Sequence, residues 1–304
     1  MIQARALTKH YGRTVAVDGL SFDVEPGRVT GFLGPNGAGK STTMRLILGL
    51  DHPTSGTVTV LGRRYRDHFR PLHDVGAVLE AGSVHGGRSA YHHLLCLAQS
   101  NGIPRRRVTQ VLDVVGLTDV AGRRVGTFSL GMSQRLSLAA ALLGDPPVIL
   151  CDEPVNGLDP EGIRWMRELL RGLAAEGRTV FVSSHLLSEM ALTADQVIVV
   201  GRGRLLADTS VASLVANGGH SPVRVRTPGA ELLATALRDA GGTVDATGMD
   251  TLDVVGLSGS EIGDLALRLG VAVHELTPQP PSLEAAFLDL TQEATQFRAV
   301  GSTA

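Results

Sequence analysis

The sequence predicts an α/β domain with a largely parallel sheet, followed by a smaller α+β domain. Short apolar runs alternate with amphipathic segments over residues 1–215, which is the order of a parallel α/β sheet. A glycine-rich turn joins one of these expected strands to the helix that follows it. Beyond residue 222 the order changes to β-α-β-β-α-β, that of a ferredoxin-like split βαβ unit. A chain of 304 residues is long enough for two such domains.

The strands and helices of the first domain are read from the spacing of apolar residues. Short apolar runs with β-branched residues predict buried strands, and apolar residues at three- and four-residue intervals predict helices. Strands are expected at 29–33, 75–79, 148–152, 179–183 and 196–200. Helices are expected at 41–50, 107–115, 133–143, 164–176 and 186–194.

A change in composition separates the second domain from the first. Residues 216–222 carry two adjacent glycines and a Ser-Pro pair, and we expect them to form a linker. Within 223–293, strands are expected at 223–226, 243–245, 251–255 and 271–276, and helices at 230–240, 261–269 and 282–290. This region carries no catalytic cluster, so we predict an interaction or regulatory module. Residues 294–304 are expected to form a frayed tail.

The phosphate loop, Gly34–Thr42, is the most specific motif in the chain. Its residues are Gly34, Pro35, Asn36, Gly37, Ala38, Gly39, Lys40, Ser41 and Thr42, which fit G-x-x-x-x-G-K-S/T. It lies between an expected strand and an expected helix, so backbone N–H groups at the helix start point at an anion. We expect Lys40 to reach the β- and γ-phosphates of ATP and Ser41 to hold Mg²⁺. A glycine-rich turn without a ligand is the alternative.

The lysine in this loop stands out from the rest of the basic residues. Of the 28 lysine and arginine residues, only Lys9 and Lys40 are lysines. Arginine offers a planar fork of donors, whereas lysine offers a compact ammonium on a flexible stem. A lysine kept at this position in an arginine-rich chain indicates that arginine would not serve there.

Two acidic residues follow a second apolar run. Asp152 and Glu153 end the expected strand 148–152, at the edge of the sheet where open α/β folds bind ligands. Asp152 can hold Mg²⁺ opposite Ser41, and Glu153 is then free to orient or deprotonate a water molecule. An apolar strand that ends in Asp-Glu is common by itself. Paired with the phosphate loop, it predicts nucleotide hydrolysis.

The signature segment, Phe128–Arg135, carries a resemblance to a known family. It resembles the L-S-G-G-Q motif, followed by Gln-Arg, of the ATP-binding cassette (ABC) ATPases, which are the nucleotide-binding subunits of transporters. The resemblance implies a P-loop NTPase cassette, with a RecA-like core and antiparallel β and helical subdomains. It also implies that two cassettes meet head to tail, so that Ser129 and Gly131 of one subunit contact the ATP held by the other.

The signature segment departs from the family pattern at three positions. Phe128 stands where the family has leucine, Leu130 where it has glycine, and Met132 where it has glutamine. Ser129 and Gly131 remain, so closure over a phosphate is still expected. The alternative is that Ser129 is an ordinary helix N-cap with no ligand.

Three shorter matches follow the family's order, and one further position departs from its pattern. The resemblance implies that His185 is the switch histidine at the γ-phosphate, and that Tyr11 stacks under the adenine. It makes 156–159 the D-loop, although Asp159 could equally be an N-cap before Pro160. Glu80 stands where the family has a glutamine that touches Mg²⁺. A carboxylate there can ligate the metal, but it adds negative charge near the γ-phosphate.

The composition limits the classes of function. The net charge of −2 and a pI of about 6.6 give no electrostatic footprint for nucleic acid. Two cysteines, Cys96 and Cys151, form no disulfide framework and fit a reducing compartment. We expect no signal peptide, and no apolar stretch reaches the ~18 residues needed to cross a bilayer. Any membrane role is therefore expected to come through a partner.

The motifs thus predict an ATPase that uses ATP and Mg²⁺, and the resemblance implies that it works as a homodimer on a separate integral membrane permease. The second domain and residues 281–287 resemble the tail of daunorubicin-type multidrug exporters, which implies an exporter at the cytoplasmic face of the membrane. Two alternatives stay open. One is a soluble ABC ATPase without a transport role, and the other is a weakly hydrolysing nucleotide switch, to which Glu80 and Leu130 lend some weight.

Overall fold

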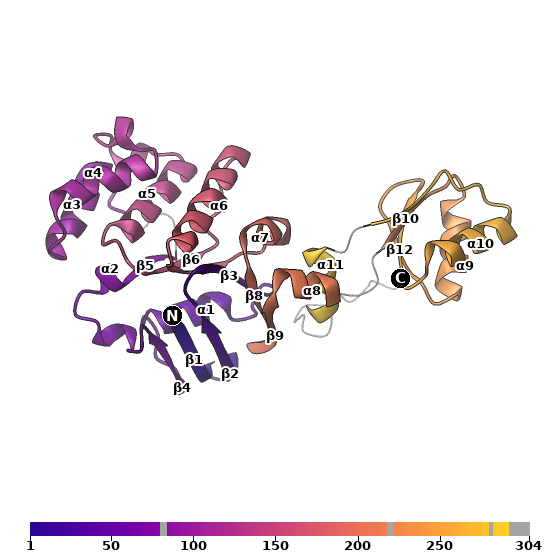
Figure 1. The fold of residues 1–304 in the computed structure, drawn as a ribbon, viewed down its shortest axis with the longest axis horizontal. Helices are drawn as coiled ribbons and strands as arrows, with labels where there is room; N and C mark the ends of the chain where they lie inside the picture. Colours follow the sequence, from indigo (N-terminus) through magenta and orange to yellow (C-terminus); the bar gives the residue numbers. More distant parts are fainter. Residues whose placement is uncertain (80–83, 218–221, 280–281, 292–304) are drawn as a thin grey trace. The chain divides into compact units, whose positions relative to one another are not determined.

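A computed structural model describes residues 1–79, 84–217, 222–279 and 282–291. Two compact units divide the chain, Met1–Val211 and Ala212–Leu290 (Figure 1). The expected domain limits at 1–215, 216–222, 223–293 and 294–304 stay predictions, and 218–221 and 292–304 lie outside the described residues. No helix in the described parts of the chain is both long and apolar enough to cross a membrane.

A six-stranded sheet forms the centre of the first unit. Its order is β5-β6-β7-β3-β8-β9, and every pairing is parallel except that of β9. The strands are β3 (Arg28–Leu33), β5 (Val75–Val78), β6 (Val148–Asp152), β7 (Thr179–Ser183), β8 (Gln196–Gly201) and β9 (Arg204–Ser210). This confirms the expected α/β class. Because β3, β7 and β6 are neighbours, the segments that follow them meet at one edge of the sheet.

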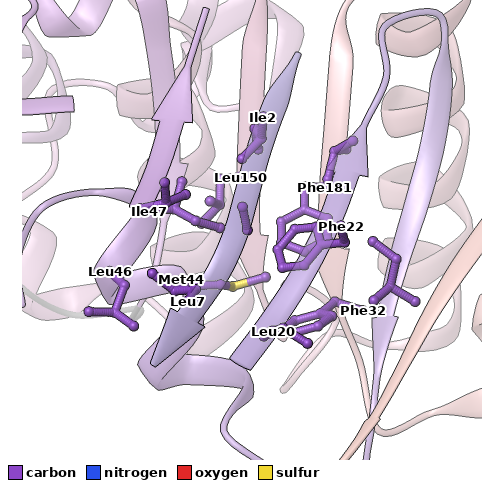
Figure 2. Close-up of a cluster of buried hydrophobic side chains, with 14 of the residues drawn as sticks. Ile2, Leu7, Leu20, Phe22, Phe32, Met44, Leu46, Ile47, Leu150 and Phe181 are labelled. Atoms are coloured by element: carbon purple, nitrogen blue, oxygen red, sulfur yellow. The ribbon is translucent and has the colours of Figure 1, made fainter. Parts of the chain in front are cut away.

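A smaller antiparallel sheet packs on the first. It contains β1 (Ile2–Tyr11), β2 (Thr14–Val24) and β4 (Ser55–Val60), in the order β2-β1-β4. The ring centroid of Phe22 of this sheet lies 5.9 Å from that of Phe32 and 5.8 Å from that of Phe181, both of the larger sheet. Figure 2 shows these rings beside the buried aliphatic side chains of the same core. The two sheets therefore share one core.

Helices cover the larger sheet and form a group of their own. In the first unit they are α1 (Lys40–Ile47), α2 (Pro71–Asp74), α3 (Ala90–Ser100), α4 (Arg105–Val114), α5 (Leu130–Leu142), α6 (Pro160–Ala175), α7 (Leu187–Thr193) and, beginning at its last residue, α8 (Val211–Asn217). Helices α3, α4 and α5 pack together (Figure 1). Helix α3 was not expected, and it begins after the N-cap Ser89, whose side chain accepts a hydrogen bond from the His92 N–H.

Three helix ends differ from the sequence expectation for identifiable reasons. Helix α6 was expected from residue 164, but it begins at Pro160, after the N-cap Asp159, whose side chain accepts a hydrogen bond from the Gly162 N–H. Helix α1 was expected to reach residue 50, but Gly49 adopts a left-handed φ of 64° and ends it at Ile47. The Leu50 N–H then bonds to the Arg45 carbonyl, which is typical of a glycine C-cap. Helix α5 was expected from residue 133, but it begins at Leu130, directly after the Ser129 N-cap.

The second unit has the expected order β-α-β-β-α-β. Its elements are β10 (Val223–Arg226), α9 (Ala230–Asp239), β11 (Thr243–Ala246), β12 (Thr251–Val255), α10 (Gly259–Leu269), β13 (Glu275–Pro278) and a last helix, α11 (Leu283–Thr291). The sheet order is β11-β12-β10-β13 and all pairs are antiparallel. The first and third strands are central, as in a split βαβ unit.

The last strand of this unit begins later than expected. The strand was predicted from residue 271, but residues 270 and 271 form the C-terminal cap of α10. Gly270 has a φ of 67°, and the Val271 N–H donates to the Ala266 carbonyl. The Ala272 carbonyl then accepts a hydrogen bond from the Thr227 hydroxyl. Regular pairing with β10 starts only at Glu275, opposite Arg226.

Candidate functional site

The phosphate loop connects β3 to α1 and depends on its glycines for shape. Gly37 and Gly39 have φ values of 79° and 98°, which side chains other than glycine rarely adopt. A Cβ atom on Gly39 would lie 2.3 Å from the carbonyl oxygen of Ala16, and one on Gly34 would lie 2.5 Å from that of Val200. Gly39 is also the N-cap of α1 and has no side chain to bond the first turn. The N–H groups of that turn are therefore available to an anion.

Lys40 lies along the inside of this loop. Its Nζ donates to the carbonyl oxygens of Gly34, at 2.6 Å, and Pro35, at 3.4 Å, and the residue is only 9% exposed. Burial lowers the pKa of Lys40, and the nearby carboxylates of Glu153 and Asp152 act in the opposite direction. The loop cation and the two acids are thus close enough to interact electrostatically.

Asp152 ends β6 and Glu153 follows it, and both are bonded to residues at the end of β7 or just after it. The Ser183 hydroxyl donates to the Asp152 carboxylate and accepts from the Glu153 N–H at 3.0 Å. Glu153 Oε2 lies 2.7 Å from His185 Nδ1 and accepts the His185 N–H at 3.2 Å. Glu153 has a left-handed φ of 51°, which costs about 1–3 kcal/mol for such a residue and is found most often at functional sites.

A pocket of about 630 Å³ brings these groups together. It is lined by Asn36, Gly37, Ala38, Gly39, Lys40, Ser41 and Thr42 of the loop, by Glu153, Asn156 and His185, and by Thr14, Val15 and Ala16. This volume is typical of a small-molecule site. The contribution of 14–16, the start of β2, was not expected, because only the folded structure shows that the Ala16 carbonyl lies against Gly39 of the loop.

Ser41 lines the pocket, whereas Asp152 does not line it and lies beside it, next to Glu153 in the chain. Their oxygen atoms suit Mg²⁺ rather than a softer metal. The Ser41 hydroxyl and the Asp152 carboxylate offer oxygen atoms, which Mg²⁺ prefers, and this ion takes few protein ligands beside substrate phosphates. Among the described residues no group of three or more His, Cys, Asp or Glu side chains could hold a metal ion by itself. Cys151 is buried in β6, and burial raises its pKa to about 12, so it stays a thiol. Glu80 lies outside the described residues.

The signature segment does not reach the pocket of its own chain. The Ser129 hydroxyl accepts a hydrogen bond from the Met132 N–H at 3.2 Å, so it does act as the N-cap of α5. Of the described residues that line the pocket, none belongs to Phe128–Arg135. Leu130 is 57% exposed and packs on Gly157, where an added Cβ would lie 2.1 Å from a Leu130 methyl carbon. Within the described residues, Ser129 and Gly131 thus lie outside the pocket that the phosphate loop lines.

Tyr11 lies at the end of β1, and its ring is anchored at the hydroxyl. The hydroxyl donates to Asp51 Oδ2 at 2.8 Å, and the Arg45 side chain binds the same oxygen. Lys9 Nζ lies 4.8 Å from the ring centroid of Tyr11, and Tyr11 is 46% exposed. The ring does not line the pocket in the described structure, so its stacking on adenine stays a prediction.

Replacement of this ring gives a measurable test. Tyr11→Ala is expected to weaken ATP binding about 5- to 150-fold, because stacking of a base on an aromatic ring contributes ~1–3 kcal/mol. Tyr11→Phe keeps the ring and is expected to bind within about fivefold of the parent, since only the bond to Asp51 is lost. Fluorescence titration with ATP and with inorganic triphosphate separates the two parts of the nucleotide. Equal ATP affinity in Tyr11→Ala and the parent would contradict the stacking role.

The sequence and the fold are similar to those of proteins with a named function. Residues 17–156 match the family described as ABC transporter, and 221–284 match a domain of unknown function. The bacitracin transport ATP-binding protein BcrA of Bacillus licheniformis is 42% identical over 211 residues, 68% of this chain and 69% of that protein. The lantibiotic transport ATP-binding protein SrtF of Streptococcus pyogenes is 35% identical over 208 residues, 68% and 90% of the two chains. The dimeric structure of MJ0796, a bacterial ABC transporter cassette, is 25% identical, with a TM-score of 0.63 over 69% of this chain and 99% of that chain.

Proposed function

The chain belongs to the family of ABC transporter ATP-binding proteins, and from that premise we propose that it hydrolyses MgATP to drive a separate permease that exports an antibiotic or a similar small molecule. One observation carries the catalytic part. The phosphate loop with Lys40 and the hydrogen-bonded pair of Glu153 and His185 line one pocket. A cation for the phosphates and a carboxylate for water are the two groups that hydrolysis of a phosphoanhydride requires.

The residues that would bind the phosphates, the metal and the water each have a stated role in this proposal. The N–H groups of α1 and Lys40 bind the β- and γ-phosphates, and Ser41 and Asp152 would hold Mg²⁺. The ion, when bound, neutralises charge on the phosphate oxygens. Glu153 accepts a proton from water as the water oxygen attacks the γ-phosphorus. The bond between that phosphorus and the bridging oxygen breaks, which gives ADP and phosphate. His185 holds Glu153 Oε2 during this step.

We infer that a second copy of the chain is the partner that completes the pocket. Ser129 and Gly131 of the same chain do not line it. A head-to-tail homodimer would bring the signature segment of each subunit to the loop of the other. The dimeric cassette that this chain resembles supports the arrangement. The net charge of −2 supports no nucleic-acid partner.

The permease is inferred from the relatives. BcrA and SrtF are named for transport of bacitracin and of a lantibiotic, which favours transport over a soluble role without a membrane. We therefore place the chain at the cytoplasmic face of the membrane, bound through a permease. The daunorubicin-type exporters, suggested by the second domain, are one form of this proposal.

Co-expression tests the transport role. The chain is produced together with the permease encoded next to its gene, and separately with an unrelated permease as the control. We expect it to purify from membranes only with the adjacent permease, and its ATPase rate to rise when a transported compound is added. A chain that stays in the soluble fraction, with the same rate in both cases, would contradict the transport role and leave a soluble ATPase.

A further inference from the structure

We propose that Ser183 is a positioning residue that orients both acids of the ATPase site through one hydroxyl group. The inference rests on the proposed function, since it assumes that Asp152 faces the metal and Glu153 the water. Ser183 is the last residue of β7 and is fully buried, with 0% exposure. It pairs with Asp152 in the sheet, so its side chain is carried to the same edge.

The hydroxyl group of Ser183 has a different role toward each acid. It donates its single proton to Asp152 Oδ1 and accepts the backbone N–H of Glu153 at 3.0 Å. An ionised carboxylate only accepts, and a backbone amide only donates, so the group between them must do both. Serine and threonine side chains meet that requirement, whereas alanine meets neither half of it.

The bond to Asp152 fixes one oxygen of that carboxylate. With Oδ1 held by Ser183, the free orientation of the carboxylate is lost, and Oδ2 remains as the oxygen that would face Mg²⁺. Residues that hold a metal ligand in place typically change metal affinity or activity about 10- to 100-fold when they are removed. Ser183 should therefore influence the Mg²⁺ requirement of nucleotide binding without touching the nucleotide.

The bonds to Glu153 stabilise its left-handed backbone. The Glu153 N–H is shared between the hydroxyl and the carbonyl of Ser183, at 3.0 and 3.2 Å. From the other side, the buried Gln134 amide donates to the Pro154 carbonyl at 2.9 Å. These bonds hold the residue at a φ of 51°, the backbone conformation in which its carboxylate meets His185. Loss of the hydroxyl should let the carboxylate leave that position.

The neighbouring serine is a matched control. Ser184 is also buried, at 1% exposure, and its hydroxyl accepts the Leu186 N–H at 3.0 Å. Ser184→Ala removes the same atom from the same loop, one residue away, without removing a bond to Asp152 or Glu153. Thermal unfolding of each variant shows whether it is folded before its kinetics are compared.

The experiment measures hydrolysis and metal-dependent binding separately. For Ser183→Ala we expect kcat to fall about 10- to 100-fold, with KM for MgATP changed by less than about threefold. In fluorescence titrations at 4 °C, the affinity for ATP in EDTA should stay unchanged. The Mg²⁺ concentration that gives half of the maximal increase in ATP binding should rise about tenfold. Ser183→Thr should restore most of kcat, and Ser184→Ala should alter neither quantity.

Different results would contradict the role of Ser183 and the proposed ATPase function. A parent-like kcat and Mg²⁺ requirement in Ser183→Ala would overturn the positioning role, as would equal losses in Ser184→Ala, which would indicate general packing. Glu153→Gln is measured beside them. If it loses turnover while Ser183→Ala does not, the function stands and the inference fails. If Glu153→Gln has the kcat of the parent, Glu153 is not the general base, and the role proposed for Ser183 is wrong as well.

Discussion

Lys40→Ala is expected to lower the affinity for ATP by about 100-fold or more, and with it all measurable hydrolysis at millimolar ATP. The ammonium is buried beside the loop carbonyls, in a pocket that carries the charge of Asp152 and Glu153. Hydrogen bonds to charged groups contribute about 1.5–3 kcal/mol each, and Lys40 is expected to reach two phosphates. Without it, the acids face the triphosphate with one opposing charge fewer.

The same variant series tests why this position is a lysine. Lys40→Arg keeps the charge, but a planar guanidinium must fit where a compact ammonium lies between the Gly34 and Pro35 carbonyls. We expect it to bind ATP nearly as weakly as Lys40→Ala. Lys9→Ala is the matched control, because it removes the other lysine at a partly exposed position, where Nζ donates to the His52 carbonyl and a cation–π contact contributes about 0.5–1 kcal/mol.

Two measurements decide the outcome for Lys40. Titration with a fluorescent ATP analogue gives the affinity, and the rise of the unfolding temperature with ATP gives an independent estimate, since a ligand that binds only the folded state stabilises it. We expect Lys40→Ala to lose both the tight binding of ATP and the rise of the unfolding temperature with ATP. Lys9→Ala should keep both. Binding of ATP by Lys40→Ala as tight as that of the parent would overturn the assignment of the phosphate loop.

The sequence predicts those parts of the site that lie at or directly after the end of a parallel strand. The phosphate loop, the acids after β6 and His185 after β7 each follow a parallel strand, and parallel strands end at the same edge of a sheet. A motif at the end of each strand therefore predicts that the three will meet. The pocket lined by Lys40, Glu153 and His185 is consistent with that reasoning.

The parts that the sequence does not predict depend on contacts between distant residues of ordinary type. Nothing in the residues around Asp51 shows that it binds the Tyr11 hydroxyl, and a serine at 183 is unremarkable until β7 is seen beside β6. The packing of Leu130 on Gly157 is of the same kind. In β1 the alternation of buried residues is interrupted by register shifts and a positive φ at Ala6, so the strand pattern is weak there.

Glu153→Gln should keep ATP binding and lose turnover by about 10²- to 10⁴-fold, the usual contribution of a general base. The amide has nearly the same shape as the carboxylate and can still accept a hydrogen bond from His185, but it cannot take a proton from water. Removal of a negative charge near the γ-phosphate should also leave binding equal or tighter. Glu161→Gln, at an exposed acid in the first turn of α6, is the control.

The same variant also tests whether the site is shared between two subunits. If ATP holds two copies together until it is hydrolysed, Glu153→Gln with ATP should elute as a stable dimer in size-exclusion chromatography, and Glu161→Gln should not. A Ser129→Ala change added to Glu153→Gln should weaken that dimer, because the signature segment would contact the ATP of the other copy. Slow turnover with tight binding but no dimer would keep Glu153 as the base and remove the shared site, whereas unchanged turnover would remove Glu153 itself.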